Sequence, residues 1–314
     1  MSITTAKEND FSSFRLPAWF RQEIPDFSAI KRMKDLLNRR GLTTVCQQAH
    51  CPNQGRCWHQ GHATFMILGD RCTRACRFCA VATGLPQDVD AREADEVARA
   101  VAELNLAYVV ITSVTRDDLP DGGAGQFVKT IQAVRHFSPM TKIEVLIPDF
   151  GLQRSSLESV VEAHPDVIAH NMETVARLYP RVRPQAGYRR SLDVLKTVGE
   201  MDKAIFLKSG FMVGLGEMDD EIRDLTADVA ATGCRLLTIG QYLSPSRGGR
   251  HVPVERFVVP QQFADYQQQA LDMGFGHVFS GPLVRSSYLA EDGYRHLAGH
   301  SEENYGALTG EIVS

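Results

Sequence analysis

The chain lacks long apolar runs, an excess of basic charge and an even set of cysteines. No hydrophobic stretch approaches the roughly 18 residues that a membrane-spanning helix needs. The 34 Lys and Arg are outnumbered by 38 Asp and Glu, which gives a formal net charge of -4. A general nucleic-acid binder usually carries a basic excess. We therefore expect neither a membrane nor a nucleic acid as a partner.

The N-terminal segment offers no targeting signal. Residues 1–14 contain no apolar core of the kind found in secretory signals, and Lys7 is mixed with Glu8 and Asp10. Transit peptides are rich in Arg and poor in acidic residues. The sequence thus predicts a cytoplasmic protein.

The seven cysteines cannot all pair in disulfides within one chain. Six of them lie between Cys46 and Cys79, and Cys234 stands alone. Clustering of this kind in a cytoplasmic protein favours metal or redox chemistry over a disulfide framework.

Apolar runs and amphipathic stretches alternate from residue 64 onwards, which is typical of parallel β/α architectures. The expected strands are 64–68, 108–112, 142–147, 166–170, 204–213 and 236–240, with a last short one at 277–280. Six strands alternating with helices predict an α/β fold, a partial (β/α)6 TIM-like barrel with its helices outside. We expect an N-terminal extension (1–60), the barrel (61–280) and a C-terminal extension (281–314) whose tail after Leu289 is peripheral.

The first cysteine triplet follows the first expected strand, in the sequence ILGDRCTRACRFCAV, and reads Cys72-x3-Cys76-x2-Cys79. Loops after the strands form the catalytic face of such barrels. Three thiolates can hold three irons of a four-iron cluster and leave the fourth iron open to another ligand. Arg residues within the triplet, Arg74 among them, are expected to offset the charge of the cluster. A zinc site is the alternative, although zinc usually takes four protein ligands in paired spacing.

This spacing, with Phe78 before the last cysteine, resembles the radical S-adenosylmethionine superfamily. The open iron of that superfamily binds the amino and carboxylate groups of the methionine moiety. The segment GFMVGLGE resembles its adenine-contact segment, and HNMET resembles its ribose contacts. The resemblance implies these cofactor contacts: Phe78, Asn171, Glu173, Gly210, Met212, Gly214 and Glu217.

The second triplet, in VCQQAHCPNQGRCW, reads Cys46-x4-Cys51-x5-Cys57 and again lacks a fourth cysteine. A zinc site completed by a neighbouring histidine is possible from the spacing, but an auxiliary iron–sulfur cluster fits better beside the first motif. Cys234 precedes the sixth expected strand, at the N-terminal end of the barrel, which normally serves stability. We expect it to be a buried apolar cysteine and no ligand.

The two triplets together with ATFMILGD, VITSVTRDDLPDGGA, LTIGQYLSPS and GPLVRSSYLA resemble the lipoyl synthase family over residues 16–290. Thr115 stands where that pattern has an acid. The resemblance implies that Ser287 completes the auxiliary cluster held by Cys46, Cys51 and Cys57, whereas the residues alone leave Ser286 and Ser287 open.

The resemblance also implies an activity. Sulfur would be inserted at carbons 6 and 8 of an octanoyl-lysine by 5′-deoxyadenosyl radicals from S-adenosylmethionine. Of two [4Fe–4S] clusters, the auxiliary one would donate sulfur, with Cys51 and Ser287 serving that step. The implied partners are octanoylated carrier domains (2-oxoacid dehydrogenase E2 subunits and the glycine cleavage H protein), a reductant such as flavodoxin or ferredoxin, and an iron–sulfur carrier that rebuilds the cluster.

Two other functions remain open. A biotin-synthase-like enzyme would also insert sulfur, but the N-terminal triplet and the RSSY segment argue against it. A two-cluster electron carrier would complete each cluster with four cysteines on a short chain, whereas both triplets here are incomplete.

Overall fold

The computed structural model describes residues 16–22, 27–246 and 249–299. The strands are β1 (Thr43–Thr44), β2 (Thr64–Ile67), β3 (Arg71–Cys72), β4 (Ala82–Thr83), β5 (Tyr108–Ser113), β6 (Lys142–Leu146), β7 (Val167–Ala169), β8 (Phe206–Val213), β9 (Leu236–Gln241) and β10 (His277–Gly281). The α-helices are α1 (Phe27–Arg40), α2 (Val45–Gln48), α3 (Gln54–His59), α4 (Glu93–Glu103), α5 (Ala124–Phe137), α6 (Arg154–Glu162), α7 (Tyr179–Val182), α8 (Tyr188–Met201), α9 (Asp219–Ala230), α10 (Pro260–Asp272) and α11 (Ala290–Leu297). Short 3-10 helices lie at Ala18–Phe20, Phe150–Leu152 and Ala176–Leu178.

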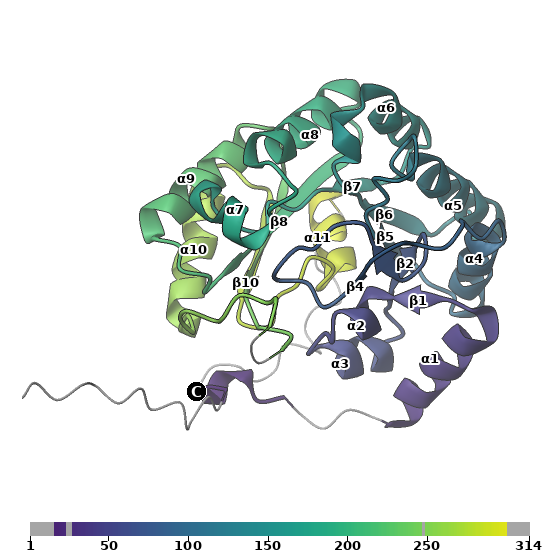
Figure 1. The fold of residues 1–314 in the computed structure, drawn as a ribbon, viewed down its shortest axis with the longest axis horizontal. Coiled ribbons are helices and arrows are strands. Elements are labelled where there is room, and N and C mark those ends of the chain that lie inside the picture. The colour runs from purple at the N-terminus through teal and green to yellow at the C-terminus, as the bar shows by residue number, and fades with distance from the viewer. Residues whose placement is uncertain (1–15, 23–26, 247–248, 300–314) are drawn as a thin grey trace, which may run out of the picture.

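The main sheet has eight strands in the order β1-β2-β5-β6-β7-β8-β9-β10. From β2 to β10 every described pairing is parallel, while β1 runs antiparallel to β2. The edge strands β1 and β10 are not paired with each other in the described part of the chain, so the barrel stays open. Figure 1 shows the curved sheet with α4, α5, α6, α8, α9 and α10 around its outside.

The partial barrel confirms the predicted fold class, with one correction to the main sheet. β10 pairs with β9 over its whole length, so the last short strand expected at residues 277–280 is a parallel strand of the main sheet. The two-residue β1 was not predicted, because Thr43 and Thr44 show no apolar periodicity. They form a strand only because they pair with Met66 and Phe65 of β2.

The strands of the main sheet form from largely apolar stretches of the sequence, which become buried. All four residues of β2 and all six of β9 are buried. Parallel strands that are covered on both faces read as uninterrupted apolar runs, which is why the sequence predicts them well. The helices bury one face only, as α4 does with Val97 and Val101.

Helix α11 lies inside the curve of the sheet, not at the periphery as the sequence predicted (Figure 1). The Tyr294 ring centroid lies 5.7 Å from those of Tyr108 and Phe206, which begin β5 and β8. Gly293 permits this approach, since an added Cβ would come within 3.0 Å of the Phe279 ring. Polar residues on the outer face of α11 hid its inward apolar stripe. The helix therefore packs against the N-terminal ends of the strands, opposite the end where the cysteine loop lies.

The N-terminal segment is joined to the barrel. Arg40 forms ion pairs with Glu96 at 2.9 Å and Glu103 at 2.7 Å, which link α1 to α4. Within the described ranges, no helix is both long and apolar enough to cross a membrane.

Candidate active site

Two adjoining cavities bring together the residues that the sequence singled out. The larger holds about 480 Å³ at the C-terminal ends of the strands, and the smaller holds about 80 Å³ beside it. Of the predicted site residues, the larger is lined by Cys46, Cys51, Cys72, Cys76, Phe78, Cys79, Asn171, Glu173, Gly210, Met212 and Ser287. The smaller is lined by Cys46, Cys51, Cys57 and Ser287. Cys46, Cys51 and Ser287 thus stand between the two.

The first triplet occupies the loop that follows β2, where Cys72 ends the short strand β3. The backbone N–H groups of Arg74 and Thr115 donate to Cys72 Sγ at 3.4 and 3.3 Å. Thr115, where the family pattern has an acid, therefore contacts the first triplet through its backbone N–H. Hydrogen bonds to sulfur are one of the means by which proteins tune iron–sulfur clusters.

The thiols of the first triplet are close enough to influence one another. Burial raises the pKa of Cys79 to about 12, and the Cys76 and Cys72 thiols add to that rise. Burial also raises the pKa of Cys76, and the Arg183 guanidinium opposes the rise. Such thiols remain protonated until a metal centre displaces their protons.

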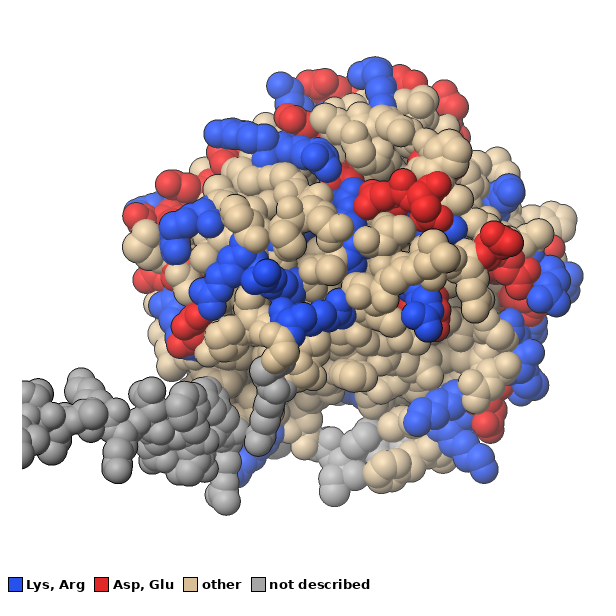
Figure 2. Space-filling view, in the orientation of Figure 1, with Lys and Arg blue, Asp and Glu red and all other residues tan. Residues whose placement is uncertain are grey.

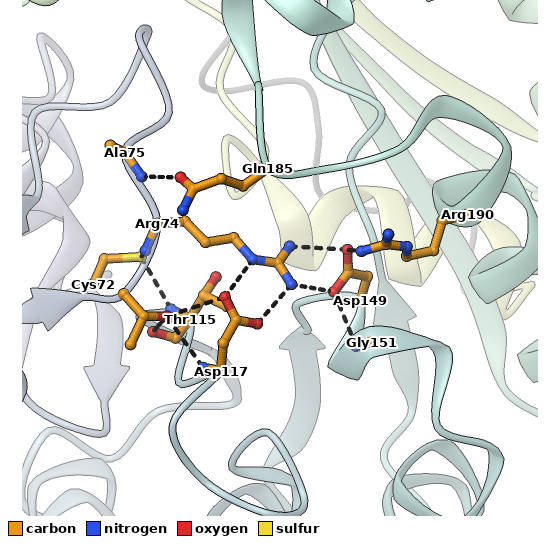
Figure 3. Close-up of polar contacts among 10 residues, drawn as sticks. Cys72, Arg74, Ala75, Thr115, Asp117, Asp149, Gly151, Gln185 and Arg190 are labelled. Atoms are coloured by element: carbon orange, nitrogen blue, oxygen red, sulfur yellow. Dashed lines mark hydrogen bonds and ion pairs between the residues drawn. The ribbon is translucent and has the colours of Figure 1, made fainter.

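The Arg74 side chain corrects an expectation. Its guanidinium bonds to Asp117 and Asp149, each at 2.7 Å, instead of standing free to offset cluster charge. Figure 3 shows Arg74 held between the two carboxylates, with Arg190 reaching Asp149 from the far side. Arg74 and Asp149 are 7% and 1% exposed, so this pair fixes the cysteine loop to the end of β6. Burial opposes ionisation of Asp149, but Arg74 outweighs it and holds the Asp149 pKa below its ordinary range.

Replacing Asp149 with Asn should destabilise the fold, because it leaves part of a buried guanidinium charge uncompensated. We expect a loss of about 3 kcal/mol in the free energy of unfolding at pH 7, the low end for broken buried pairs since Asp117 remains. The depressed Asp149 pKa means that this stabilisation is present above about pH 4 and is lost as the pH falls below it. Urea denaturation of the metal-free protein measures it.

The matched control is Asp90→Asn, which removes the carboxylate of an exposed pair with Arg92. This change should leave the denaturation midpoint where it was. Equal midpoints for the Asp149 and Asp90 variants would refute the structural role of the buried pair.

The carbonyl of Cys79 is held by a segment that sequence reasoning missed. Arg250 Nη2 donates to Cys79 O at 3.0 Å and to Val81 O at 2.8 Å, and His251 Nε2 lies 2.9 Å from Cys79 O. These contacts span about half the chain, so no local pattern reveals them.

Asn171 and Glu173 follow β7 and face the larger cavity. Asn171 Nδ2 donates to Glu173 Oε1 at 3.0 Å. Burial raises the pKa of the Glu173 carboxyl, while the Arg183 guanidinium and the Asn171 amide lower it. Glu173 adopts φ 66°, and its backbone pairs with β8, where its carbonyl accepts from Met212 N at 2.9 Å. Glu173 thus has a sparsely populated backbone conformation. Its carboxylate and the Asn171 amide lie in the same wall of the larger cavity.

The segment GFMVGLGE, residues 210–217, has different roles at its two ends. A Cβ at Gly210 would meet Thr238 Oγ1 at 2.2 Å, so the close packing of β8 and β9 beside the cavity requires glycine there. Gly214 and Glu217 line neither cavity. The Glu217 carboxylate instead accepts from the backbone N–H groups of Gly214 and Leu215, at 2.5 and 2.8 Å. The structure thus places these two residues in the turn after β8, outside both cavities, and their contact with the cofactor stays a prediction.

The second triplet lies on two short helices, with Cys46 in α2, Cys57 in α3 and Cys51 between them. Burial raises the pKa of Cys57 to about 12, helped by the Cys51 and Cys46 thiols. Ser287 reaches this site from a distant part of the chain, and its Oγ accepts from Thr64 Oγ1 at 2.8 Å. Asn53 Nδ2 donates to Leu283 O at 2.6 Å and ties the two segments together.

Cys234 is a buried cysteine outside both cavities, as predicted. It is 4% exposed, and its Sγ donates to the carbonyls of Leu207 and Leu236.

The donor sets fit iron–sulfur clusters. The seven cysteines carry free thiols. No three His, Cys, Asp or Glu side chains in the described ranges are arranged to hold a single metal ion. A cubane cluster is wider than one ion, so its ligands lie farther apart than those of a mononuclear zinc site.

Comparison with known proteins places this site in context. The profile of the Radical SAM superfamily matches residues 66–229. A lipoyl synthase of Rubrobacter xylanophilus is 51% identical over 276 residues, which cover 88% of this chain and 85% of that protein. A lipoyl synthase of Caldicellulosiruptor bescii is 52% identical over 281 residues, covering 90% and 96%.

Two solved structures are similar in fold alone. HydG, a maturase of the [FeFe]-hydrogenase, aligns with a TM-score of 0.53 at 12% identity, over 82% of this chain and 56% of its own. Streptococcus suis SuiB bound to S-adenosylmethionine aligns with a TM-score of 0.52 at 10% identity, over 70% and 50%.

Proposed function

This chain belongs to the lipoyl synthase family of radical S-adenosylmethionine enzymes. We propose that the larger of its two adjoining cavities binds S-adenosylmethionine and that the smaller one binds the sulfur donor. The protein is a sulfur-inserting enzyme that uses S-adenosylmethionine and a [4Fe–4S] cluster. Cys72, Cys76 and Cys79 would hold that cluster. The auxiliary cluster would lie in the smaller cavity, held by Cys46, Cys51, Cys57 and Ser287.

The residues of the larger cavity would orient S-adenosylmethionine. When bound, the first cluster supplies the electron that cleaves it to methionine and a 5′-deoxyadenosyl radical. Asn171 and Glu173 offer an amide and a carboxylate to the ribose hydroxyls. Phe78 and Met212 contribute apolar walls, with Gly210 giving space, and such walls keep water from a reactive radical.

The auxiliary cluster would be a substrate, consumed as the sulfur donor. At carbons 6 and 8 of the octanoyl chain, one hydrogen atom passes to a 5′-deoxyadenosyl radical and one C–S bond forms to a cluster sulfide. The electron released with each bond passes to the irons. Ser287 suits this role, since a hard alkoxide matches a soft cluster less well than thiolate does and lets its iron leave more readily.

The observation that carries the proposal is the shared wall of the two cavities. Cys46, Cys51 and Ser287 border both of them, so a donor held there adjoins the place where a radical would form.

The substrate would be an octanoyl-lysine on a carrier domain, with the E2 subunits of 2-oxoacid dehydrogenases and the glycine cleavage H protein as the specific carriers. Arg71, Arg77 and Arg250 are exposed around the cysteine loop. Figure 2 shows a band of Lys and Arg crossing the middle of this face. Acidic carrier surfaces would meet it by charge complementarity. A flavodoxin or ferredoxin would supply electrons, and an iron–sulfur carrier would rebuild the donor.

Assaying the reduced protein with an octanoylated carrier tests the function. We expect a lipoyl group on the carrier and two 5′-deoxyadenosine molecules for each one, because two C–H bonds are broken. Dethiobiotin, the substrate of the competing sulfur-insertion reaction, should give no product. Product from dethiobiotin alone, or S-adenosylmethionine left uncleaved, would contradict the proposal.

A further inference from the structure

Ser286 and Ser287 are the central residues of a tight turn. Tyr288 N donates to Arg285 O at 2.9 Å and closes it. Contacts just before the turn hold it in place. Asn53 donates to the carbonyl of Leu283, and Val284 packs so closely against Gly240 that an added Cβ there would lie 2.2 Å from Val284 O. The two hydroxyls therefore cannot change places without moving the turn.

The hydroxyls have different partners. Ser287 Oγ accepts from Thr64 beside the second triplet, as described above. Ser286 Oγ instead accepts from Asn171 Nδ2 at 2.5 Å, on the side of the first triplet. Neighbouring residues of one turn thus reach two separate sites.

We infer that Ser286 is a positioning residue for the nucleoside end of the S-adenosylmethionine site and acts through the carboxamide of Asn171. The inference rests on the proposed function, which assigns Asn171 to the ribose. It gives Ser286 a role of its own, distinct from that of Ser287, the proposed ligand of the auxiliary cluster.

The geometry of the amide explains how the hydroxyl acts. Nδ2 carries two N–H groups, and the structure directs one to Ser286 Oγ and the other to Glu173 Oε1. With both donors engaged, the amide has one orientation. Its Oδ1 is buried without a hydrogen-bond partner in the described part of the chain, next to Gly210, where an added Cβ would lie 3.2 Å away. An oxygen held in this way is ready to accept from a ribose hydroxyl.

Removal of the Ser286 hydroxyl frees one donor and lets the amide rotate. A hydrogen bond of this kind contributes about 0.5–1.5 kcal/mol, so the dissociation constant for S-adenosylmethionine should rise about two- to twelvefold. Neither the cysteines nor Ser287 lose a contact, so the iron content of the protein should not change.

The test compares variants of the anaerobically reconstituted protein by equilibrium dialysis with S-adenosylmethionine and by iron analysis. Ser286→Ala should weaken binding as stated and retain full iron. Ser286→Thr, which keeps the hydroxyl, should bind more tightly than Ser286→Ala. The matched control is Ser280→Ala, which loses a hydroxyl bonded to Phe263 O outside both cavities and should bind as the parent does.

A double-mutant cycle separates positioning from independent contact. In the background Asn171→Ser, the change Ser286→Ala should add little, because the amide through which it acts is gone. Unchanged affinity in Ser286→Ala, a fully additive effect, or loss of iron in Ser286→Ala would overturn the inference. These outcomes differ from failure of the proposed function, in which the unmodified protein itself would neither bind nor cleave S-adenosylmethionine.

Discussion

Replacing Cys76 with Ala should abolish both lipoyl formation and 5′-deoxyadenosine production. Cys76 is one of only three cysteines in its loop, and its thiol faces the larger cavity beside Cys72 and Cys79. Two remaining thiols would leave two irons without a protein ligand. The rate of S-adenosylmethionine cleavage should fall at least about a thousandfold, equivalent to about 4 kcal/mol of transition-state stabilisation.

Chromatographic quantification of 5′-deoxyadenosine in the dithionite-reduced variant measures this loss. The matched control is Cys234→Ala, which removes the one cysteine that lies outside both cavities and should keep both activities. If Cys76→Ala cleaved S-adenosylmethionine at the parental rate, the first triplet would not be the cleavage site.

Replacing Cys51 with Ala should separate the two activities. Cys51 borders both cavities, yet it belongs to the second triplet and not to the triplet proposed to hold the first cluster. Lipoyl formation should fall at least about a hundredfold, or about 2.7 kcal/mol, because the donor is lost. Cleavage of S-adenosylmethionine should persist within a small factor of the parental rate.

The ratio of 5′-deoxyadenosine to lipoyl product is the measurement that isolates this effect, because it cancels differences in protein concentration and reduction. It should rise far above two in Cys51→Ala, and Ser287→Ala should raise it in the same direction. Full lipoyl product from Cys51→Ala would remove the second triplet from the sulfur-donor role.

The sequence predicts those parts of the molecule that local pattern controls. Buried strands such as β5 and β9 are largely apolar runs, and the spacing of Cys72, Cys76 and Cys79 in their loop predicts a shared ligand without any knowledge of distant contacts.

Other features depend on contacts between distant segments and carry no local signal. Thr64 and Ser287 are 223 residues apart in the chain, and Asn53 and Leu283 are 230 apart. Residues 285–288 form a closed turn whose two hydroxyls have separate partners, and pattern alone could not assign either one.

Sequence pattern predicts the roles of polar side chains least well, because the partners of these side chains decide their roles. Arg74 was expected to offset cluster charge, but Asp117 and Asp149 compete for its guanidinium at shorter range. These charged neighbours outcompete the weaker interaction that the pattern suggested.

The second triplet and Ser287 are proposed to hold a sulfur donor that is consumed. To test this directly, the protein is reconstituted with isotopically heavy sulfide, freed of unbound sulfide, and given one turnover on an octanoylated carrier. We expect a lipoyl group with both sulfurs heavy, and iron falling from about eight to about four atoms per chain. A lipoyl group with light sulfur, or formed without loss of iron, would contradict it.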